Sequence, residues 1–247
     1  MNILQQDAPH FDLLPTYFEG NSRILKQSSS ADFLLERLKP TIFSHLANGP
    51  IPLPGIDRVR RRLSSYFCQL LEASGIKTAT WDSVGELALI HKEKVAPIEV
   101  VVKSAFIGSP KHLYLGLDKR VGRDGTLLNV GDRHPPYVRF DWRNPLPEPD
   151  RVIPEALADR FIDTQKAKTT ALLAFKCLRE HLLQKSFDLL DICFFMNETG
   201  DTICGEVSTD NTQIIYTGSD PELKVLFSKR EKEAMLERAI MIEERMR

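Results

Sequence analysis

The stretch that most constrains the fold runs from Ile98 to Phe106 and reads IEVVVKSAF. β-Branched residues favour extended backbone, and a nearly continuous apolar run is typical of a strand buried on both faces. The sequence therefore predicts a central, buried strand. Lys103 interrupts this run, and a buried ammonium group needs a partner. The partner could be a phosphate, held together with the following segment Gly108-Ser109-Pro110-Lys111-His112, or a carboxylate of the core. The residues leave both alternatives open.

Shorter elements surround this strand. Apolar alternation and turn residues predict one strand before Gly20 and one after it. The same signals predict further strands at residues 33–38 and 86–91, and a hairpin of 187–196 with 202–208. Helical spacing predicts helices at 57–74, ended by Gly75, at 163–183 and at 228–247. The proline-rich residues 49–55 and the segment 116–151 show no such periodicity, so we expect them to be irregular. This mixture predicts an α+β fold.

The order of these elements suggests three parts. We expect residues 1–16 to form a loose N-terminal arm, 17–96 a lobe rich in antiparallel strands, and 97–247 a mixed α/β lobe with a terminal helix. A ligand cleft would then lie between the two lobes.

Composition excludes several classes of protein. Lys plus Arg (33) nearly balances Asp plus Glu (34), so the net charge of −1 gives no reason to expect nucleic acid or an acidic membrane as a partner. No apolar run reaches the roughly 18 residues of a membrane-spanning helix, and residues 1–14 do not resemble a secretory signal. The four cysteines form no CxxC pair, so we expect reduced thiols, no zinc site and a cytoplasmic protein.

Three further clusters could carry chemistry. The turn Gly20-Asn21-Ser22-Arg23 could lay backbone N–H groups over a phosphate, or be a plain hairpin turn. Glu206 and Asp210 could ligate a hard cation such as Mg²⁺ or hold a hydroxylated substrate. The cluster of arginines at positions 58, 60, 61 and 62 is expected on the solvated face of its helix.

Three stretches, in order, resemble the SAICAR synthetase family, the purine-pathway ligases that join aspartate to a carboxyaminoimidazole ribotide. Residues 51–76 resemble a family segment that starts with an IPGKG sequence and continues into a helix. Residues 97–109 resemble the family's strand and Gly-Ser loop. Residues 191–195 and 205–213 resemble its hairpin and its DExxxPDxSR motif. The likeness extends from about Tyr17 to Tyr216.

This resemblance implies a two-lobed α+β fold and a small phosphorylated substrate, together with ATP and Mg²⁺ if the family activity is retained. By position it places Lys103, Ser109 and Asp210 at the ribotide, and Gly20 and Arg23 at ATP. It places Glu206 as the catalytic and metal-binding acid. A homo-oligomer is compatible with this assignment.

The sequence departs from the family pattern mainly on the ATP side. Cys193 and Phe195 stand where the family has Lys and Glu, Gly205 replaces its metal-binding Asp, and Gln213 replaces an Arg. We therefore expect weaker binding of ATP·Mg²⁺ than in a purine-pathway ligase. Two alternatives follow from these departures. The chain could bind a phosphorylated, nucleotide-like ligand without ATP chemistry, or it could be a non-catalytic partner subunit.

Overall fold

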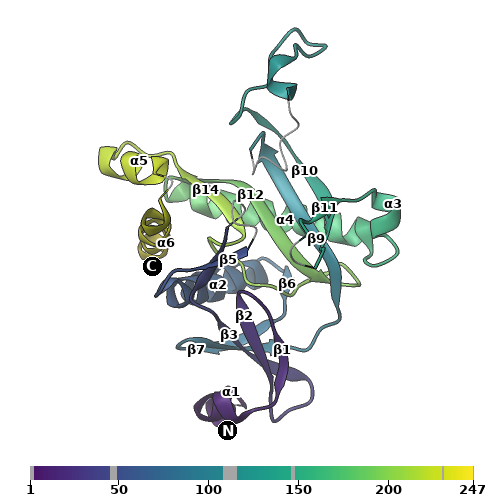
Figure 1. Cartoon of the computed structure of the whole chain (residues 1–247), viewed down its shortest axis with the longest axis vertical. Coiled ribbons are helices and arrows are strands. Elements are labelled where there is room, and N and C mark those ends of the chain that lie inside the picture. The colour runs from purple at the N-terminus through teal and green to yellow at the C-terminus, as the bar shows by residue number, and fades with distance from the viewer. Residues whose placement is uncertain (1–2, 45–48, 108–115, 146–147, 230, 247) are drawn as a thin grey trace.

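The computed structural model describes residues 3–44, 49–107, 116–145, 148–229 and 231–246. Within them, a five-stranded antiparallel sheet and a seven-stranded sheet, antiparallel except for its β13–β6 pair, are packed on opposite sides of one long helix, α2 (Ile56–Ala73), as Figure 1 shows. This arrangement is the α+β class predicted from the sequence.

The smaller sheet is built from the N-terminal part of the chain. Its five strands lie in the order β1-β2-β3-β8-β7, and all neighbours are antiparallel. Their bounds are β1 (Thr16–Glu19), β2 (Arg23–Gln27), β3 (Phe33–Leu38), β7 (Thr80–Val84) and β8 (Leu87–His91). The predicted strand, glycine turn and strand around Gly20 are confirmed as the β1–β2 hairpin.

The larger sheet holds the predicted central strand. Its order is β11-β10-β9-β12-β13-β6, with β14 also paired to β12. The bounds are β6 (Lys77–Thr78), β9 (Val95–Ala105), β10 (Arg133–Trp142), β11 (Arg151–Val152), β12 (Phe187–Asn197), β13 (Thr202–Ile203) and β14 (Thr212–Tyr216). The strand β9 lies between β10 and β12, so the central position expected for IEVVVKSAF is confirmed.

Helices cover one face of the larger sheet. The amphipathic helix α4 (Thr164–Gln184) contacts β9, β10 and β12, and its N-terminus is capped by the Asp163 carboxylate, which accepts from the Lys166 N–H. The terminal helix α6 (Lys232–Met246) contacts α2, and α5 (Pro221–Ser228) lies beside α6. The short helix α3 is Glu155–Ala158. None of the described helices has the length and apolarity needed to span a membrane.

Three expectations about irregular segments are wrong. Residues 3–13 are not a loose arm: they form α1 (Ile3–Asp7) and a 3-10 helix (Ala8–Leu13), because Leu4 and Phe11 pack into a small core with Leu35 and Leu89. The proline-rich segment contains β5 (Gly49–Pro52), which pairs with β4 (Thr41–Ser44). A two-stranded ribbon tolerates prolines because a strand's N–H groups alternate in direction and only those facing the partner need to pair.

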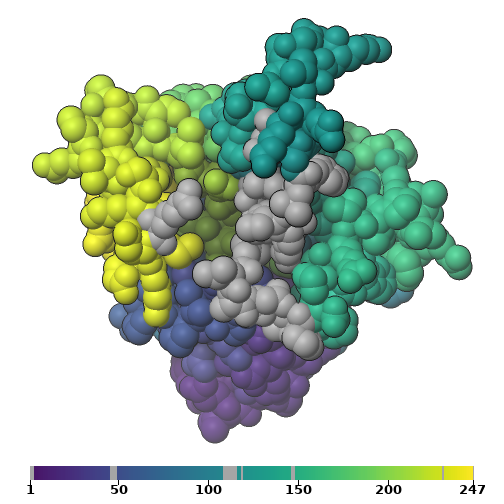
Figure 2. Space-filling view, turned by 45° about the horizontal axis from the view of Figure 1, so that its top comes forward, coloured from purple at the N-terminus to yellow at the C-terminus, as the bar shows by residue number. Residues whose placement is uncertain are grey.

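The third wrong expectation concerns the segment 116–151, which contains the ten-residue strand β10. Before β10, a short 3-10 helix (Leu117–Lys119) and the residues after it stand out from the body of the protein (Figures 1 and 2).

Candidate functional site

The larger sheet has one apolar and one polar face, and the register of its three middle strands explains the difference. On the apolar face, Ile98, Val100 and Val102 of β9 are buried within the main core, to which α4 also contributes. The intervening residues point to the other face, and directly opposed residues of antiparallel strands share a face. This polar sheet face therefore gathers Glu99, Val101 and Lys103 of β9, Asp141, Arg139 and Tyr137 of β10, and Phe195, Cys193 and Asp191 of β12.

Lys103 is paired on this face with a carboxylate of the protein. The ammonium group forms an ion pair with Asp191, its direct neighbour on β12, and donates a hydrogen bond of 2.9 Å to the carbonyl oxygen of Ile107. Only 3% of Lys103 is exposed. Of the two partners left open by the sequence, the described structure contains the core carboxylate. Ser109, with the rest of the 108–112 segment, lies outside the described residues, so its role in an anion site stays a prediction.

Glu99 is the least neutralised acid of the polar sheet face. Burial, followed by repulsion from Asp150, raises the pKa of Glu99 from 4.5 to about 7, and the opposing effects of Cys193 and Arg143 are smaller. By contrast, Asp141 is held by two nitrogens on one edge of the Arg139 guanidinium, Nε and Nη2, with N–O distances of 2.7 and 2.5 Å. Glu99 is therefore the carboxyl on this face that changes its charge near neutral pH.

A second set of charged residues lies where α2 meets the smaller sheet and the loop after β13. Arg60 is fully buried, and its Nη2 atom lies 2.7 Å from Glu206 Oε1 and 3.3 Å from Asp210 Oδ2. The Glu206 acceptor also receives a hydrogen bond from the Ser208 hydroxyl at 3.2 Å. The structure thus brings together the two acids that the sequence predicted as site residues, with a guanidinium between them.

The neighbouring arginine of α2 binds a third acid. Arg61 lies 2.5 Å from one oxygen of Glu36, and Arg23 lies 2.9 Å from the other. Burial raises the pKa of Glu36, but the two guanidinium groups outweigh burial and lower this pKa to about 2. We call these six side chains the arginine–carboxylate network: Arg23, Arg60, Arg61, Glu36, Glu206 and Asp210.

The expectation of a solvated arginine face is wrong for two of the four arginines. Arg60 and Arg61 are buried, whereas Arg58 and Arg62 are exposed and pair with Glu86 and Glu243. The sequence did carry a signal for Arg60. It follows Ile56 by four residues and precedes Leu63 by three, so helical spacing places it on the apolar face.

Glu206 differs from Glu36 in two respects. Burial, followed by repulsion from Asp210, raises the pKa of Glu206, although Arg60 acts against this change. Its second oxygen, Oε2, is buried and has no hydrogen-bond partner among the described residues. One carboxylate oxygen of the site is thus left as an unused acceptor.

The predicted ATP-side residues lie in the β1–β2 turn. The N–H of Gly20 donates to the carbonyl oxygen of Arg23 at 2.9 Å, as in a hairpin turn, and the Arg23 side chain is engaged by Glu36. Packing also explains why position 20 is a glycine, because a Cβ atom there would lie 2.9 Å from the Phe18 ring. Whether these two residues bind a nucleotide stays a prediction.

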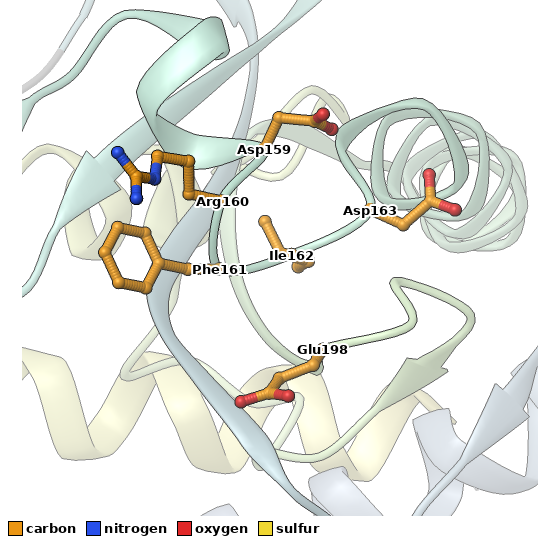
Figure 3. A pocket seen from close by; sticks show the side chains of 6 residues that line it. All are labelled: Asp159, Arg160, Phe161, Ile162, Asp163 and Glu198. Atoms are coloured by element: carbon orange, nitrogen blue, oxygen red, sulfur yellow. The ribbon is translucent and has the colours of Figure 1, made fainter.

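A hollow elsewhere in the molecule is lined by three acids that already have partners, together with Arg160, Phe161 and Ile162. It has a volume of about 370 Å³ and lies where the start of α4 meets the turn after β12 (Figure 3). Asp159 accepts from Thr164, Asp163 caps α4, and Glu198 pairs with Lys94. We therefore place no ligand site in this hollow.

Comparison with known proteins agrees with this architecture. The family model described as SAICAR synthetase matches residues 35–224, most of the chain. A solved structure described as SAICAR synthetase (Type-2) in complex with ADP has a TM-score of 0.73 at 24% identity, covering 94% of this chain and 97% of that one. A SAICAR synthase of Saccharomyces cerevisiae complexed with SAICAR has a TM-score of 0.65 at 16% identity, covering 95% of this chain and 94% of that one. These structural likenesses show the fold. The chain belongs to the SAICAR synthetase family.

Two relatives with curated names differ in length. A phosphoribosylaminoimidazole-succinocarboxamide synthase of Exiguobacterium sibiricum is 26% identical over 201 residues, which cover 77% of each chain. The bifunctional cordycepin biosynthesis cluster protein 3 of Cordyceps militaris is 25% identical over 223 residues, covering 74% of this chain. This chain spans only 25% of the length of the Cordyceps protein.

Proposed function

We propose that the protein is an ATP-dependent carbon–nitrogen ligase that forms an amide between the carboxylate of a ribotide-like substrate and an amine such as that of aspartate. The observation that carries this proposal is the family match over residues 35–224. The name of the Exiguobacterium relative, a synthase of the same kind, supports it. A ligand site between the 17–96 and 97–247 parts of the chain is part of the proposal.

The proposed chemistry has two balanced steps. A carboxylate oxygen of the ribotide attacks the γ-phosphorus of ATP, which gives an acyl phosphate and ADP. The amine nitrogen then attacks the acyl carbon, the bond to the phosphate oxygen breaks, and the amine loses a proton. The products are the amide, ADP and phosphate.

Glu99 is suited to accept the proton of the amine. A general base works best when its pKa lies near the working pH, and the pKa of Glu99 is about 7. We place the amine near Glu99 on the polar sheet face. Lys103, Ser109 and Asp210 are assigned to the phosphorylated substrate, Glu206 to the reacting groups, and Gly20 with Arg23 to ATP.

The acids of the arginine–carboxylate network do not fit a resident Mg²⁺ ion. Mg²⁺ requires near-octahedral oxygen ligands at about 2.0–2.1 Å, whereas Glu206 Oε1 and Asp210 Oδ2 are both bound to Arg60. Among the described residues, no group of three or more His, Cys, Asp or Glu side chains is arranged to hold a metal. The assignment of Glu206 as a metal ligand therefore lacks support in this geometry, and we route no step through a metal at this position.

The experiment is a turnover assay in which ADP and the amide product are measured by liquid chromatography. We expect both products only when ATP, a carboxylated aminoimidazole ribotide and aspartate are all present. Nucleoside-type carboxylates belong in the same screen, because the Cordyceps relative is named for a cordycepin cluster. Ligand binding without ADP formation for any carboxylate and amine would favour the non-ligase alternative.

The Glu99→Gln variant tests the proposed base within the same assay. We expect kcat to fall by about 100-fold or more, and the wild-type increase in rate as the pH rises through about 7 to disappear. A conservative control is Glu86→Gln, which changes an exposed carboxylate of the smaller sheet region and should leave kcat unchanged. Equal kcat values and pH profiles in wild type and Glu99→Gln would remove Glu99 from the mechanism.

A further inference from the structure

All three nitrogens of the Arg60 guanidinium group have partners. Nε donates to Glu206 at 3.2 Å, and Nη2 lies between Glu206 and Asp210 at 2.7 and 3.3 Å. Nη1 donates to the carbonyl oxygens of Thr41 and Lys39, at 2.5 and 3.4 Å. The guanidinium thus makes four hydrogen bonds and one further ion-pair contact, with Asp210. Arg60 is thus fixed by both the acids and the backbone.

Three of the four oxygens of the two acids are engaged, and Glu206 Oε2 is the one without a partner among the described residues. Oε1 of Glu206 accepts from Arg60 and Ser208, while Asp210 Oδ1 accepts from the backbone N–H of Phe43 at 3.3 Å and Oδ2 faces Arg60. The acids come from a loop distant in sequence from the helix that carries Arg60, so tertiary packing sets this contact. A divalent cation between these carboxylates would have to occupy the position of the guanidinium.

Charge balance supports the same conclusion. The arginine–carboxylate network contains three guanidinium groups and three carboxylates, namely Arg23, Arg60 and Arg61 against Glu36, Glu206 and Asp210. Buried charges are stable only when they are paired. A divalent cation added to this set would leave two positive charges in excess in a buried region.

We propose that Arg60 is a built-in cation that takes the place of a divalent metal ion at Glu206 and Asp210. The guanidinium holds the two carboxylates in place and keeps the pair closed to Mg²⁺ in the resting protein. Removing the guanidinium converts the acid pair into a metal site. This inference concerns the unliganded protein and does not depend on the proposed reaction.

The test is Mn²⁺ binding to the full chain without nucleotide, measured by electron paramagnetic resonance. We expect the Arg60→Gln variant to bind one Mn²⁺ ion at least about tenfold more tightly than wild type, and to lose this gain in the Arg60→Gln/Glu206→Gln double variant. We also expect the melting temperature of Arg60→Gln to be lower than that of wild type, and to rise with Mg²⁺ by more than that of wild type.

Arg61→Gln is the matched control, because it removes the adjacent buried guanidinium from a single carboxylate, Glu36, which retains Arg23. We expect its melting temperature to fall without any gain of Mn²⁺ binding. A folded Arg60→Gln protein that gains no Mn²⁺ site would overturn the proposal. Mn²⁺ binding in Arg61→Gln equal to that in Arg60→Gln would overturn it as well.

If the Arg60→Gln protein does not fold, a second measurement on the wild-type protein tests the proposal. Wild-type crystals soaked in Mn²⁺ are examined by anomalous diffraction. An anomalous peak bound to Glu206 and Asp210 overturns the proposal, and an undisturbed Arg60 contact with no such peak supports it.

Discussion

The arginine–carboxylate network and the polar sheet face both contain clustered acids, but they neutralise them differently. In the network, guanidinium groups balance the three acids, and Glu36 keeps its negative charge down to a pH of about 2. On the sheet face, Lys103 and Arg139 bind Asp191 and Asp141, and Glu99 is left with a pKa of about 7. The network thus pairs its acids with guanidinium groups at the junction of helix and strands, whereas the polar sheet face holds a buried carboxyl that can exchange a proton near neutral pH.

This difference separates two roles. A buried ion pair holds segments of the chain together, whereas a carboxyl with a pKa near neutral can accept and release a proton at the working pH. We therefore assign proton transfer to the sheet face, and we expect the network to hold the proposed substrate-side residues Glu206 and Asp210 in place. Each of the following variants tests one side of this assignment.

The largest effect on stability is expected for Glu36→Gln. This change leaves buried Arg61 without its carboxylate, and breaking a buried pair costs about 3–5 kcal/mol. Urea denaturation at pH 7 measures this loss. The same Glu→Gln change at exposed Glu86, which pairs with Arg58, is the control and should cost under about 1 kcal/mol. Equal losses in both variants would mean that the network does not stabilise the fold.

Protonation of Glu36 at low pH should destabilise the fold, as the Glu36→Gln change does. Its folded-state pKa is depressed from 4.5 to about 2, so its contribution is present above pH 4.5 and is lost as the pH falls toward about 2. We expect Glu36→Gln to reduce the loss of stability in this range. Parallel pH profiles of wild type and variant would contradict the depressed pKa.

Glu99→Gln should stabilise the protein at pH 8, whereas Glu36→Gln destabilises it. The pKa of Glu99 is raised from 4.5 to about 7, so the native state binds the proton more tightly than the unfolded state does. Wild-type stability therefore contains a decrease as the pH rises from 4.5 to about 7, worth up to about 3 kcal/mol. We expect Glu99→Gln to remove this decrease, so that it is more stable than wild type at pH 8. The midpoint of urea denaturation at pH 5 and pH 8 measures this change, and an unchanged pH dependence would contradict the raised pKa of Glu99.

A smaller loss is expected for Lys103→Met. The change removes the partner of Asp191 and the donor to Ile107, and Asp191 is partly accessible to water, so we expect a cost of about 2 kcal/mol in the absence of any ligand. The double variant Lys103→Met/Asp191→Leu should recover part of this loss, because it leaves no unpaired carboxylate. Unchanged unliganded stability in Lys103→Met would instead favour a ligand phosphate as the main partner of Lys103.

The smallest effect is expected on the Cys193 thiol. Burial, followed by the charge of Glu99, raises the pKa of Cys193 well above 9, so the thiol should react slowly with iodoacetamide. Glu99→Gln removes the nearby charge, and we expect alkylation to become a few times faster. A Cys177→Ser background removes the signal of the other half-buried thiol, and mass spectrometry follows the modified site.

The regular elements could be predicted from local pattern, but the charged contacts could not. Periodicity located β9 and α4, because the spacing of apolar residues is a local property. Arg60 was misassigned because Arg is usually solvated, and its partners come from a loop far away in the sequence. The sequence indicated that Lys103 needs a partner, but only the β9–β12 register identifies Asp191. The strand β10 was missed because its prolines, arginines and histidine hide the alternation of Val138 and Phe140.

The most direct test of the central comparison is a nuclear magnetic resonance titration of the glutamate side-chain carboxyl carbons. The labelled protein is titrated between about pH 3 and about pH 9, and Glu99 and Glu36 are assigned from the Glu99→Gln and Glu36→Gln variants. We expect Glu99 to titrate near pH 7 while Glu36 stays ionised throughout. A Glu99 midpoint at the ordinary value of 4.5, or a Glu36 midpoint within the titrated range, would contradict the account.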